Sequence, residues 1–329
     1  MTDTSTEKDT PRSAGGEAPK RPAQGPKLRD GLLLVDKHGG CTSHDIVAST
    51  RKILRQKKIG HCGTLDPAAT GLLLLTVGRA TRLTRFLIRA PKVYLGAVRL
   101  GITTDTYDTT GEITAEQPVE GLDIDKIRAT MGTFVGTYLQ APPAYSAKKV
   151  GGVKLYEMAR RGEEVPEIRK EVHVYDFHMT EDWADGEDVE FQLGCSSGTY
   201  ARSLAHELGD ALGCGGSLSA LRRTKIGAFT VDDAVTLDGL REARDAGEAV
   251  AAWIPFDEIP LPFGDMVADV QQERRIQHGQ TVMARNVAGD EGDWVKIMSE
   301  QGKLIAVGAV VERIGNGNMG VIQPKVVFS

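Results

Sequence analysis

Short apolar runs separated by polar turns divide most of the chain into segments of strand length. GLLLVDK at 31–37 and LLLLTV at 72–77 are such runs, and residues 92–101 contain a third. Apolar and polar positions alternate over 171–180 and 188–196, which predicts two further strands paired with each other. These segments together predict a sheet that forms the centre of the protein.

Helical periodicity appears between these strands. A helix is predicted after Thr42, whose side chain can cap the first turn. In 199–213 leucines recur every four residues and a glycine suits the C-terminal cap. Shorter helices are predicted near 81–88 and 125–133. Because strands and helices do not alternate as regular βαβ units, the pattern favours an α+β fold over a doubly wound one.

The pattern changes at both ends of the chain. Residues 1–28 contain no aromatic and almost no branched aliphatic side chain, so they cannot bury enough apolar surface to offset ordering, and we predict a disordered tail. Residues 29–258 are predicted to form the main domain. The remainder, 259–329, is predicted to be a small β-barrel-like module, because it contains short strand-like segments separated by glycine-rich turns, at 294–299, 302–312 and 321–328.

Composition is that of a soluble globular protein, with 40% hydrophobic and 26% charged residues. The longest apolar runs are far below the ~20 residues of a membrane span, and the N-terminus has no signal-peptide-like stretch. We therefore expect a cytoplasmic protein that has no membrane partner. The four cysteines form no CxxC pair and are expected to be reduced thiols.

Charge is distributed unevenly. Although the net charge is -5, the stretch from Lys37 to Lys92 contains eleven basic residues and only two acidic ones, Asp45 and Asp66. A second basic cluster lies within 148–161. A basic face on an acidic protein suits a polyanion such as RNA. Solvated helix faces would be the simpler explanation of the charges taken alone.

A serine-hydrolase pattern occurs at 194–198. GCSSG fits G-x-S-x-G with Ser196 as the nucleophile, and it lies between a predicted strand and a predicted helix. The histidines that follow are His206, inside that helix, and His278, in the terminal module. Because neither has the context of a catalytic triad, and because a hydrolase leaves the basic first half unexplained, this hypothesis is disfavoured.

Metal and phosphate patterns are weaker still. Cys41, His44, His61 and Cys62 do not have a zinc spacing, because adjacent residues rarely face the same ion. The glycine-rich turn at 213–217 does not have the residue order of a phosphate-binding loop. We therefore predict no metal site.

Asp66 is the acidic residue of the segment HCGTLDPAATG, 61–71. An Asp-Pro pair usually forms a turn, and Pro67 biases Asp66 towards extended geometry. An acid beside a bound polyanion is repelled by phosphate, which makes it a poor contact residue. These residues alone leave both a turn and a chemical role open.

Four motifs in order resemble those of the bacterial tRNA pseudouridine synthase B (TruB) family. They are GLLLVDKHGGCTSHDIV, GHCGTLDPAATGLLLLTVGRATRL, APPAYSAKKVGGVKLYEMARRG and CSSGTYARSLAHELGDALGCG. The resemblance covers about 30–258, and the terminal module is similar to a PUA-type RNA-binding domain. It implies a mixed, largely antiparallel sheet flanked by helices. It also implies isomerisation of uridine 55 in the TψC arm of tRNA. Because nothing visible in the sequence demands more than a monomer, we expect a monomer that has no obligate protein partner.

Matched by position, the resemblance assigns roles to five residues. It makes Asp66 the catalytic carboxylate nucleophile, Arg202 its ion-pair partner and Tyr94 the ring that stacks on the target base. Tyr200 lines the same pocket, and His61 fills the space that the flipped base leaves. These roles are what the resemblance implies, and their geometry is an expectation.

Two further positions match, and one departs from the family. Lys37 matches the first motif and Leu221 a pocket position, while His38 stands where the family commonly has proline. The reaction breaks the N-glycosidic bond and rejoins uracil through C5 without a redox change, so we expect no cofactor. Attack by the carboxylate on the sugar, attack on the base, and loss of the 2′ proton all remain open.

Two alternatives share these features. The guide-RNA-dependent archaeal and eukaryotic branch resembles the same motifs, and turnover of bare tRNA would exclude it. A non-catalytic RNA-binding or tRNA-folding protein would also explain the basic faces and the terminal module. It predicts salt-dependent binding and normal effects on tRNA when Asp66 is changed to asparagine.

Overall fold

The computed structural model describes residues 28–143, 145, 149–150, 153–154, 161, 169–184, 186, 188–315 and 319–328. Apart from Leu28, the tail predicted for 1–28 lies outside the described residues, and so do parts of the second basic cluster. Within the described chain, no helix combines the length and the apolar character that crossing a membrane requires.

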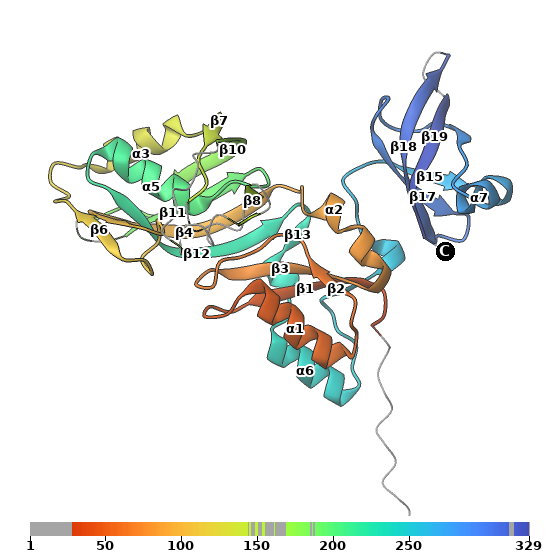
Figure 1. Ribbon diagram of the computed structural model, residues 1–329, viewed down its shortest axis with the longest axis horizontal. Coiled ribbons are helices and arrows are strands. Elements are labelled where there is room, and N and C mark those ends of the chain that lie inside the picture. The colour runs from red at the N-terminus through yellow and green to blue at the C-terminus, as the bar shows by residue number, and fades with distance from the viewer. Residues whose placement is uncertain are drawn as a thin grey trace, which may run out of the picture.

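Ten strands form one large sheet (Figure 1). The order is β14 (Trp253–Pro255), β1 (Gly31–Lys37), β3 (Thr70–Val77), β12 (Gly216–Ile226), β4 (Lys92–Leu100), β11 (Val189–Cys195), β10 (Lys170–Met179) and β7 (Gly136–Gln140), with β2 (Ile59–His61) beside β3 and β13 (Phe229–Thr230) beside β12. Among these described strands only β3 and β12 pair in parallel. The predicted α+β fold with a largely antiparallel sheet is therefore confirmed. Two short hairpins lie outside the sheet, β5 (Ile102–Thr104) with β6 (Ile113–Glu116) and β8 (Lys149–Val150) with β9 (Val153–Lys154).

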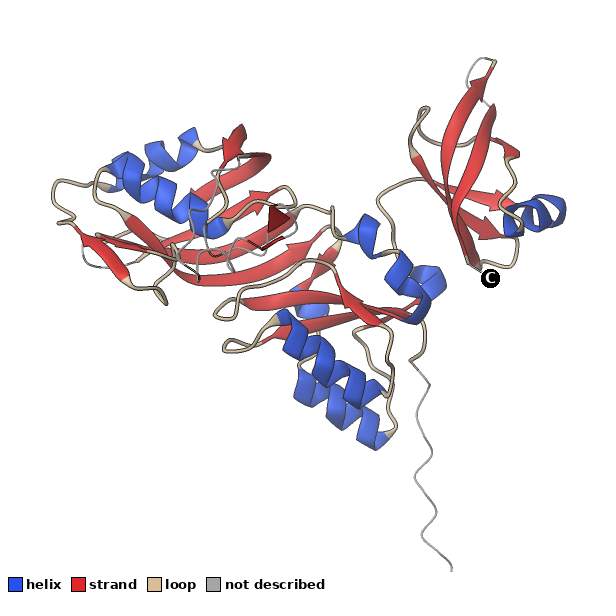
Figure 2. Ribbon diagram, viewed as in Figure 1, coloured by secondary structure: helices blue, strands red, loops and turns tan. Residues whose placement is uncertain are grey.

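Two pairs of helices cover different parts of the sheet (Figure 2). The first pair, α1 (Ser43–Leu54) and α6 (Leu237–Ala246), packs near β1 and β2, and the second, α3 (Ile124–Thr133) and α5 (Ala201–Leu212), packs on β10 and β12. Each pair closes its own hydrophobic core. The short 3₁₀ turns η2 (Val231–Asp233) and η3 (Phe256–Glu258) follow β13 and β14.

Helix α5 corresponds to the helix predicted at 199–213 and lies close against the sheet. Its leucines at every fourth position are at most 5% exposed. Gly209 is needed among them, because a Cβ there would lie 2.0 Å from the backbone nitrogen of Gly216 in β12. The helix backbone therefore approaches the central strand directly. This contact holds the C-terminal half of α5 directly against β12.

Two differences between the structure and the sequence prediction lie near the centre of the main sheet. The helix predicted at 81–88 is broken into η1 (Gly78–Arg82) and α2 (Thr84–Leu87). Strand β12 was not predicted, because its basic segment LRRTK resembles a solvated surface. Arg223 in this strand is nevertheless 1% exposed, and its Nε donates a hydrogen bond to the carbonyl of Leu72 at 2.8 Å. A buried guanidinium is tolerated where carbonyls satisfy it.

A five-stranded sheet forms the C-terminal module. Its order is β15 (Asp265–Ala268), β17 (Trp294–Ser299), β18 (Leu304–Ile314), β19 (Met319–Val327) and β16 (Val282–Arg285), with α7 (Val270–Gln277) packed against it. The module has its own core and also contributes residues to the first core of the main sheet. Ring contacts join the two parts, with centroids 4.9 Å apart for Phe256 and Phe328.

Candidate active site

A cavity of about 550 Å³ lies at the centre of the main sheet. Five of the seven site residues predicted from the sequence line it, namely Asp66, Tyr94, Tyr200, Arg202 and Leu221. They come from the loop before β3, from β4, from the segment entering α5, from α5 itself and from β12. The other two, His61 and Lys37, are not among its described lining residues.

Arg202 forms an ion pair with Asp66 in this cavity. The Nε of Arg202 lies 2.9 Å from Oδ2 of Asp66 and 3.7 Å from Oδ2 of Asp108. Its other nitrogens donate to the carbonyls of Thr106 at 2.9 Å and Tyr145 at 3.1 Å. The Arg202 side chain is 7% exposed, whereas that of Asp66 is 44% exposed. A buried, fully oriented cation thus holds a carboxylate whose remaining surface faces the cavity.

The loop that carries Asp66 is held from behind by polar side chains. The hydroxyl of Ser43, in the first turn of α1, accepts the N–H of Leu65 at 2.9 Å and donates to its carbonyl at 3.2 Å. Lys37, at the end of β1 and fully buried, donates to the carbonyls of Pro67 at 3.2 Å and Ala69 at 2.6 Å. These contacts come from two different elements and fix the loop on both sides of the acid. Lys37 therefore shapes the loop instead of facing the cavity.

Strands β4 and β12 contribute an aromatic ring and buried cations to the wall of the cavity. Tyr94 in β4 is the strand partner of Arg223 in β12. Burial raises the pKa of Tyr94, although the charge and hydrogen bond of Arg223 oppose the shift, so the phenol is neutral at physiological pH. A neutral ring is suited to stacking against a base. Burial also lowers the pKa of Lys92, on the same wall, to about 8.

His61 lies in β2, beside the Asp66 loop. Its ring packs edge-on against His44, with centroids 5.4 Å apart. Burial, with the charge of His44 next in size, lowers the pKa of His61, so this ring is mainly neutral at pH 7. His38, where the family has proline, is exposed, and its carbonyl accepts a hydrogen bond from Lys37 at 3.0 Å. The presence of histidine in place of proline at position 38 thus leaves the hydrogen bonds of Lys37 in place.

The geometry gives the disfavoured hypotheses little support. The hydroxyl of Ser196 accepts the N–H of His173 at 2.9 Å, while His206 stacks on Tyr107 with ring centroids 3.9 Å apart. Burial raises the pKa of Cys62 to about 12, which keeps this thiol protonated. In the part of the chain that the structure describes, no group of three or more His, Cys, Asp or Glu side chains is placed to hold a metal ion.

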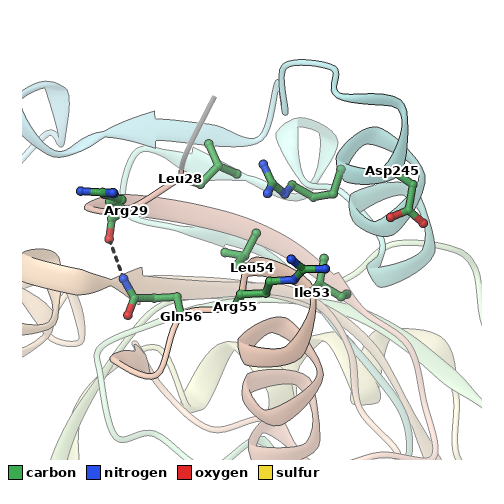
Figure 3. A pocket seen from close by; sticks show the side chains of 8 residues that line it. Leu28, Arg29, Ile53, Leu54, Arg55, Gln56 and Asp245 are labelled. Carbon is green, nitrogen blue, oxygen red and sulfur yellow. Dashed lines mark hydrogen bonds between the residues drawn. The ribbon is translucent and has the colours of Figure 1, made fainter. Parts of the chain in front are cut away.

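A separate cavity of about 560 Å³ lies where α1 and α6 end (Figure 3). None of the predicted site residues lines it. Arg55 caps α1, and Arg244 lies in the last turn of α6. Cations at these positions complement the negative end of a helix dipole. We therefore assign Arg55 and Arg244 to helix stability.

Sequence reasoning missed several residues that shape the site. Asp108 lies in the turn-rich segment 104–112, where an acid is common and gave no signal of a site. Arg223 lies in a strand that was not predicted. Gln140 is 2% exposed, and its amide clamps the main chain of Tyr200, accepting from its N–H at 2.8 Å and donating to its carbonyl at 3.2 Å. Periodicity carries no signal for such contacts, because each joins segments far apart in the chain.

Replacing Lys37 with methionine is expected to lower the free energy of unfolding by about 2–4 kcal/mol, because three main-chain carbonyls lose their buried donor. Urea denaturation followed by circular dichroism measures the change. Lys52→Met, at an exposed position of α1, is the matched control and should stay within about 0.5 kcal/mol of the parent protein. Equal effects of the two substitutions would contradict the structural role of Lys37.

Family models and relatives match most of the chain. The model described as "TruB family pseudouridylate synthase (N terminal domain)" matches residues 51–201, and that of the "tRNA pseudouridylate synthase B C-terminal domain" matches 202–255. The tRNA pseudouridine synthase B of Solibacter usitatus is 40% identical over 86% of this chain and 96% of its own length. The enzyme of the same name from Thermobifida fusca is 39% identical over 92% of this chain and 99% of its own.

Solved structures share the fold. A chain in the crystal structure of a Cbf5-Nop10-Gar1 complex superposes with a TM-score of 0.70 at 28% identity, over 91% of this chain and 85% of that chain. The structure of an H/ACA RNP bound to a substrate RNA containing 2′-deoxyuridine gives a TM-score of 0.68 at 26% identity, over 92% and 86%. The similarity covers both the main sheet and the C-terminal module, since it extends over nine-tenths of the chain.

Proposed function

The chain belongs to the TruB family of pseudouridylate synthases, isomerases that act on tRNA, and from this premise we propose that it converts uridine 55 of the TψC arm to pseudouridine with Asp66 as the nucleophile. One observation carries the proposal. A half-exposed carboxylate is held by a buried arginine on the wall of a cavity that also presents the ring of Tyr94. The cavity volume falls in the ~300–1,000 Å³ range of small-ligand sites.

The chemistry requires the uridine to leave its stack. Extrusion costs a few kcal/mol, and stacking on the Tyr94 ring, worth ~1–3 kcal/mol per base, offsets much of it. Leu221 and Tyr200 complete the wall around the base. His61, in a neutral ring form, would fill the space that the base leaves.

The carboxylate of Asp66 then acts on the sugar, on the base or through loss of the 2′ proton. In each route the bond between N1 and C1′ breaks, uracil turns, and a bond between C5 and C1′ forms. The proton that leaves C5 is balanced by the one gained at N1. Because the reaction is an isomerisation, no oxidant, reductant or cofactor enters the balance. Arg202 keeps Asp66 oriented throughout.

Binding of the tRNA is assigned to basic side chains and to the terminal module. Lys170 is exposed and lines the cavity, where it can contact backbone phosphates without reading bases. We take 29–258 as the catalytic domain and 259–329 as a PUA-like RNA-binding domain. One structural relative belongs to a complex with Nop10 and Gar1. For this chain we propose a cytoplasmic monomer that needs neither guide RNA nor an obligate protein partner.

The test is to incubate the purified full-length protein with unmodified tRNA, without guide RNA, and to map pseudouridine at nucleotide resolution. We expect modification at position 55 and none elsewhere in the tRNA. A tRNA with cytidine at position 55 is the matched control and should remain unmodified. Modification at another uridine, or none until a guide RNA or protein is added, would refute the proposal.

A further inference from the structure

A second cavity, here called the interdomain pocket, lies between α2 and the C-terminal module and has a volume of about 320 Å³. Phe86 and Arg89 line it from the main domain, and Phe263, Asp293 and Trp294 line it from the module. The Phe86 ring makes edge contacts with Phe263 at 5.4 Å and with Trp294 at 4.9 Å between centroids. The aromatic lining is therefore fixed by contacts across the domain boundary.

We propose that the interdomain pocket binds one unpaired nucleobase of an RNA. On the proposed function, this is the RNA whose target uridine enters the active-site cavity. Aromatic rings together with an arginine are the usual surface for a single-stranded base, because every base offers a π face and the guanidinium adds cation–π attraction. The volume, near the lower end of small-ligand sites, suits a single base more than a longer segment.

The arginines along this boundary are not equivalent. Arg85 already covers the rings of Phe86 and Trp294, at 5.5 and 5.6 Å from their centroids. Arg82 similarly covers Phe328. The Arg89 side chain, by contrast, is exposed and makes no hydrogen bond, ion pair or ring contact with the part of the chain that the structure describes. Arg89 lines the pocket, and its guanidinium is available to a ligand.

Asp293 narrows the chemistry of the ligand. A carboxylate in the lining disfavours phosphate, so the pocket suits a base and not the RNA backbone. Oδ2 of Asp293 already accepts the N–H of Asp290 at 2.7 Å, which leaves Oδ1 as an acceptor. A carboxylate accepts from the exocyclic amino group of a base, as acidic side chains do from cytosine N4. The base is therefore cytosine, adenine or guanine, in preference to uracil.

One chain segment connects the two cavities. Ile88 lines the active-site cavity, while the next residue, Arg89, lines the interdomain pocket. The segment is fixed because the Ile88 carbonyl accepts hydrogen bonds from Ser197 Oγ, at 2.8 Å, and from Lys92 Nζ, at 2.5 Å. Consecutive Cα atoms are about 3.8 Å apart, so the walls of the two cavities share one short segment of chain.

The experiment measures how Arg89 and single bases of the substrate depend on each other. A series of TψC hairpins, each lacking one base, is bound to the full-length parent protein and to Arg89→Gln. We expect that removing the base at one position weakens binding of the hairpin to the parent protein about tenfold. The same removal should weaken binding to Arg89→Gln less than about threefold. With the intact hairpin, Arg89→Gln should bind about fivefold more weakly than the parent protein. At that position a base without an exocyclic amino group, uracil or hypoxanthine, keeps the stacking and loses the hydrogen bond to Asp293, so it should bind between the amino-bearing base and the abasic site.

The matched control is Arg241→Gln, which removes an exposed guanidinium from α6, where it pairs only with Asp238 among the described residues. It should leave the full abasic effect intact. If every abasic position affects the parent protein and Arg89→Gln equally, or if Arg89→Gln behaves like Arg241→Gln, the pocket does not bind a base. Pseudouridine formation by the parent protein is measured in parallel, so that failure of this inference is distinct from failure of the proposed function.

Discussion

Replacement of Asp66 by asparagine is expected to reduce pseudouridine formation by about 10⁴-fold or more, because a neutral amide cannot act as the nucleophile or base. Asparagine has nearly the same shape, and its carbonyl oxygen can still accept the hydrogen bond from Arg202 that Asp66 accepts at 2.9 Å. The side chain is half-exposed, so folding should be little affected. Affinity for tRNA should stay within about threefold or increase slightly, since an acid near phosphates is removed.

Single-turnover assays with excess enzyme measure this step directly, because they report chemistry without product release. Tritium released from C5 of labelled uridine follows bond formation at that carbon, and a filter-binding assay gives the affinity. Asp45→Asn is the matched control, since Asp45 is the other acid of the same basic stretch and accepts hydrogen bonds from Thr42, the N-cap of α1, at an exposed position. It should retain nearly full activity. Activity of Asp66→Asn above about one per cent of that of the parent protein would contradict the proposed mechanism.

Replacement of Arg202 by methionine is expected to lower the rate of the chemical step by about 10²–10³-fold, the usual cost of losing an oriented electrostatic partner. The substitution leaves Asp66 and Asp108 close together without their shared cation. It also removes the donor for two main-chain carbonyls, those of Thr106 and Tyr145. We therefore expect the free energy of unfolding to fall as well, by about 1–3 kcal/mol.

A second variant separates charge from geometry at this position. Arg202→Lys keeps one positive charge but cannot direct three nitrogens at separate acceptors. It should recover much of the stability and only a small part of the rate, as measured by urea unfolding and single-turnover kinetics. Arg222→Met is the control for loss of an arginine, because Arg222 pairs with Asp36 at a partly exposed site, and it should cost less than about 1 kcal/mol. Full activity in Arg202→Met would show that the ion pair has no part in the reaction.

The pattern of apolar and polar residues predicted those elements that a short stretch of sequence is enough to specify. The apolar runs became β1 and β3, and the four-residue spacing of leucines became α5. Strand β12 escaped prediction because Arg222 and Arg223 read as surface residues. The burial of Arg223 is possible only because carbonyls of Leu72 and Gly63, far away in the sequence, accept its N–H groups.

The residues of the candidate site were likewise predicted in part from the sequence, while their contacts were shown only by the tertiary structure. The order of four motifs was enough to name the family and to select Asp66 and Arg202 as a pair. Whether two residues 136 positions apart meet depends on how the sheet is assembled, and the structure places them 2.9 Å apart. The sequence could not distinguish a residue that faces the cavity from one that holds its loop. Lys37 belongs to the second kind, since its ammonium is directed at main-chain carbonyls.

The sequence by itself therefore determined the type of fold and the family, and it selected Asp66 as the candidate acid, because apolar periodicity and motif order are properties of contiguous residues. The tertiary structure alone decided which polar groups are buried, which ones share a hydrogen bond and which ones face a cavity. Gln140 and Asp108 owe their contacts to segments from elsewhere in the chain. The physical reason is that burying a polar group is tolerated only where its partners converge, and that convergence exists only once the chain has folded.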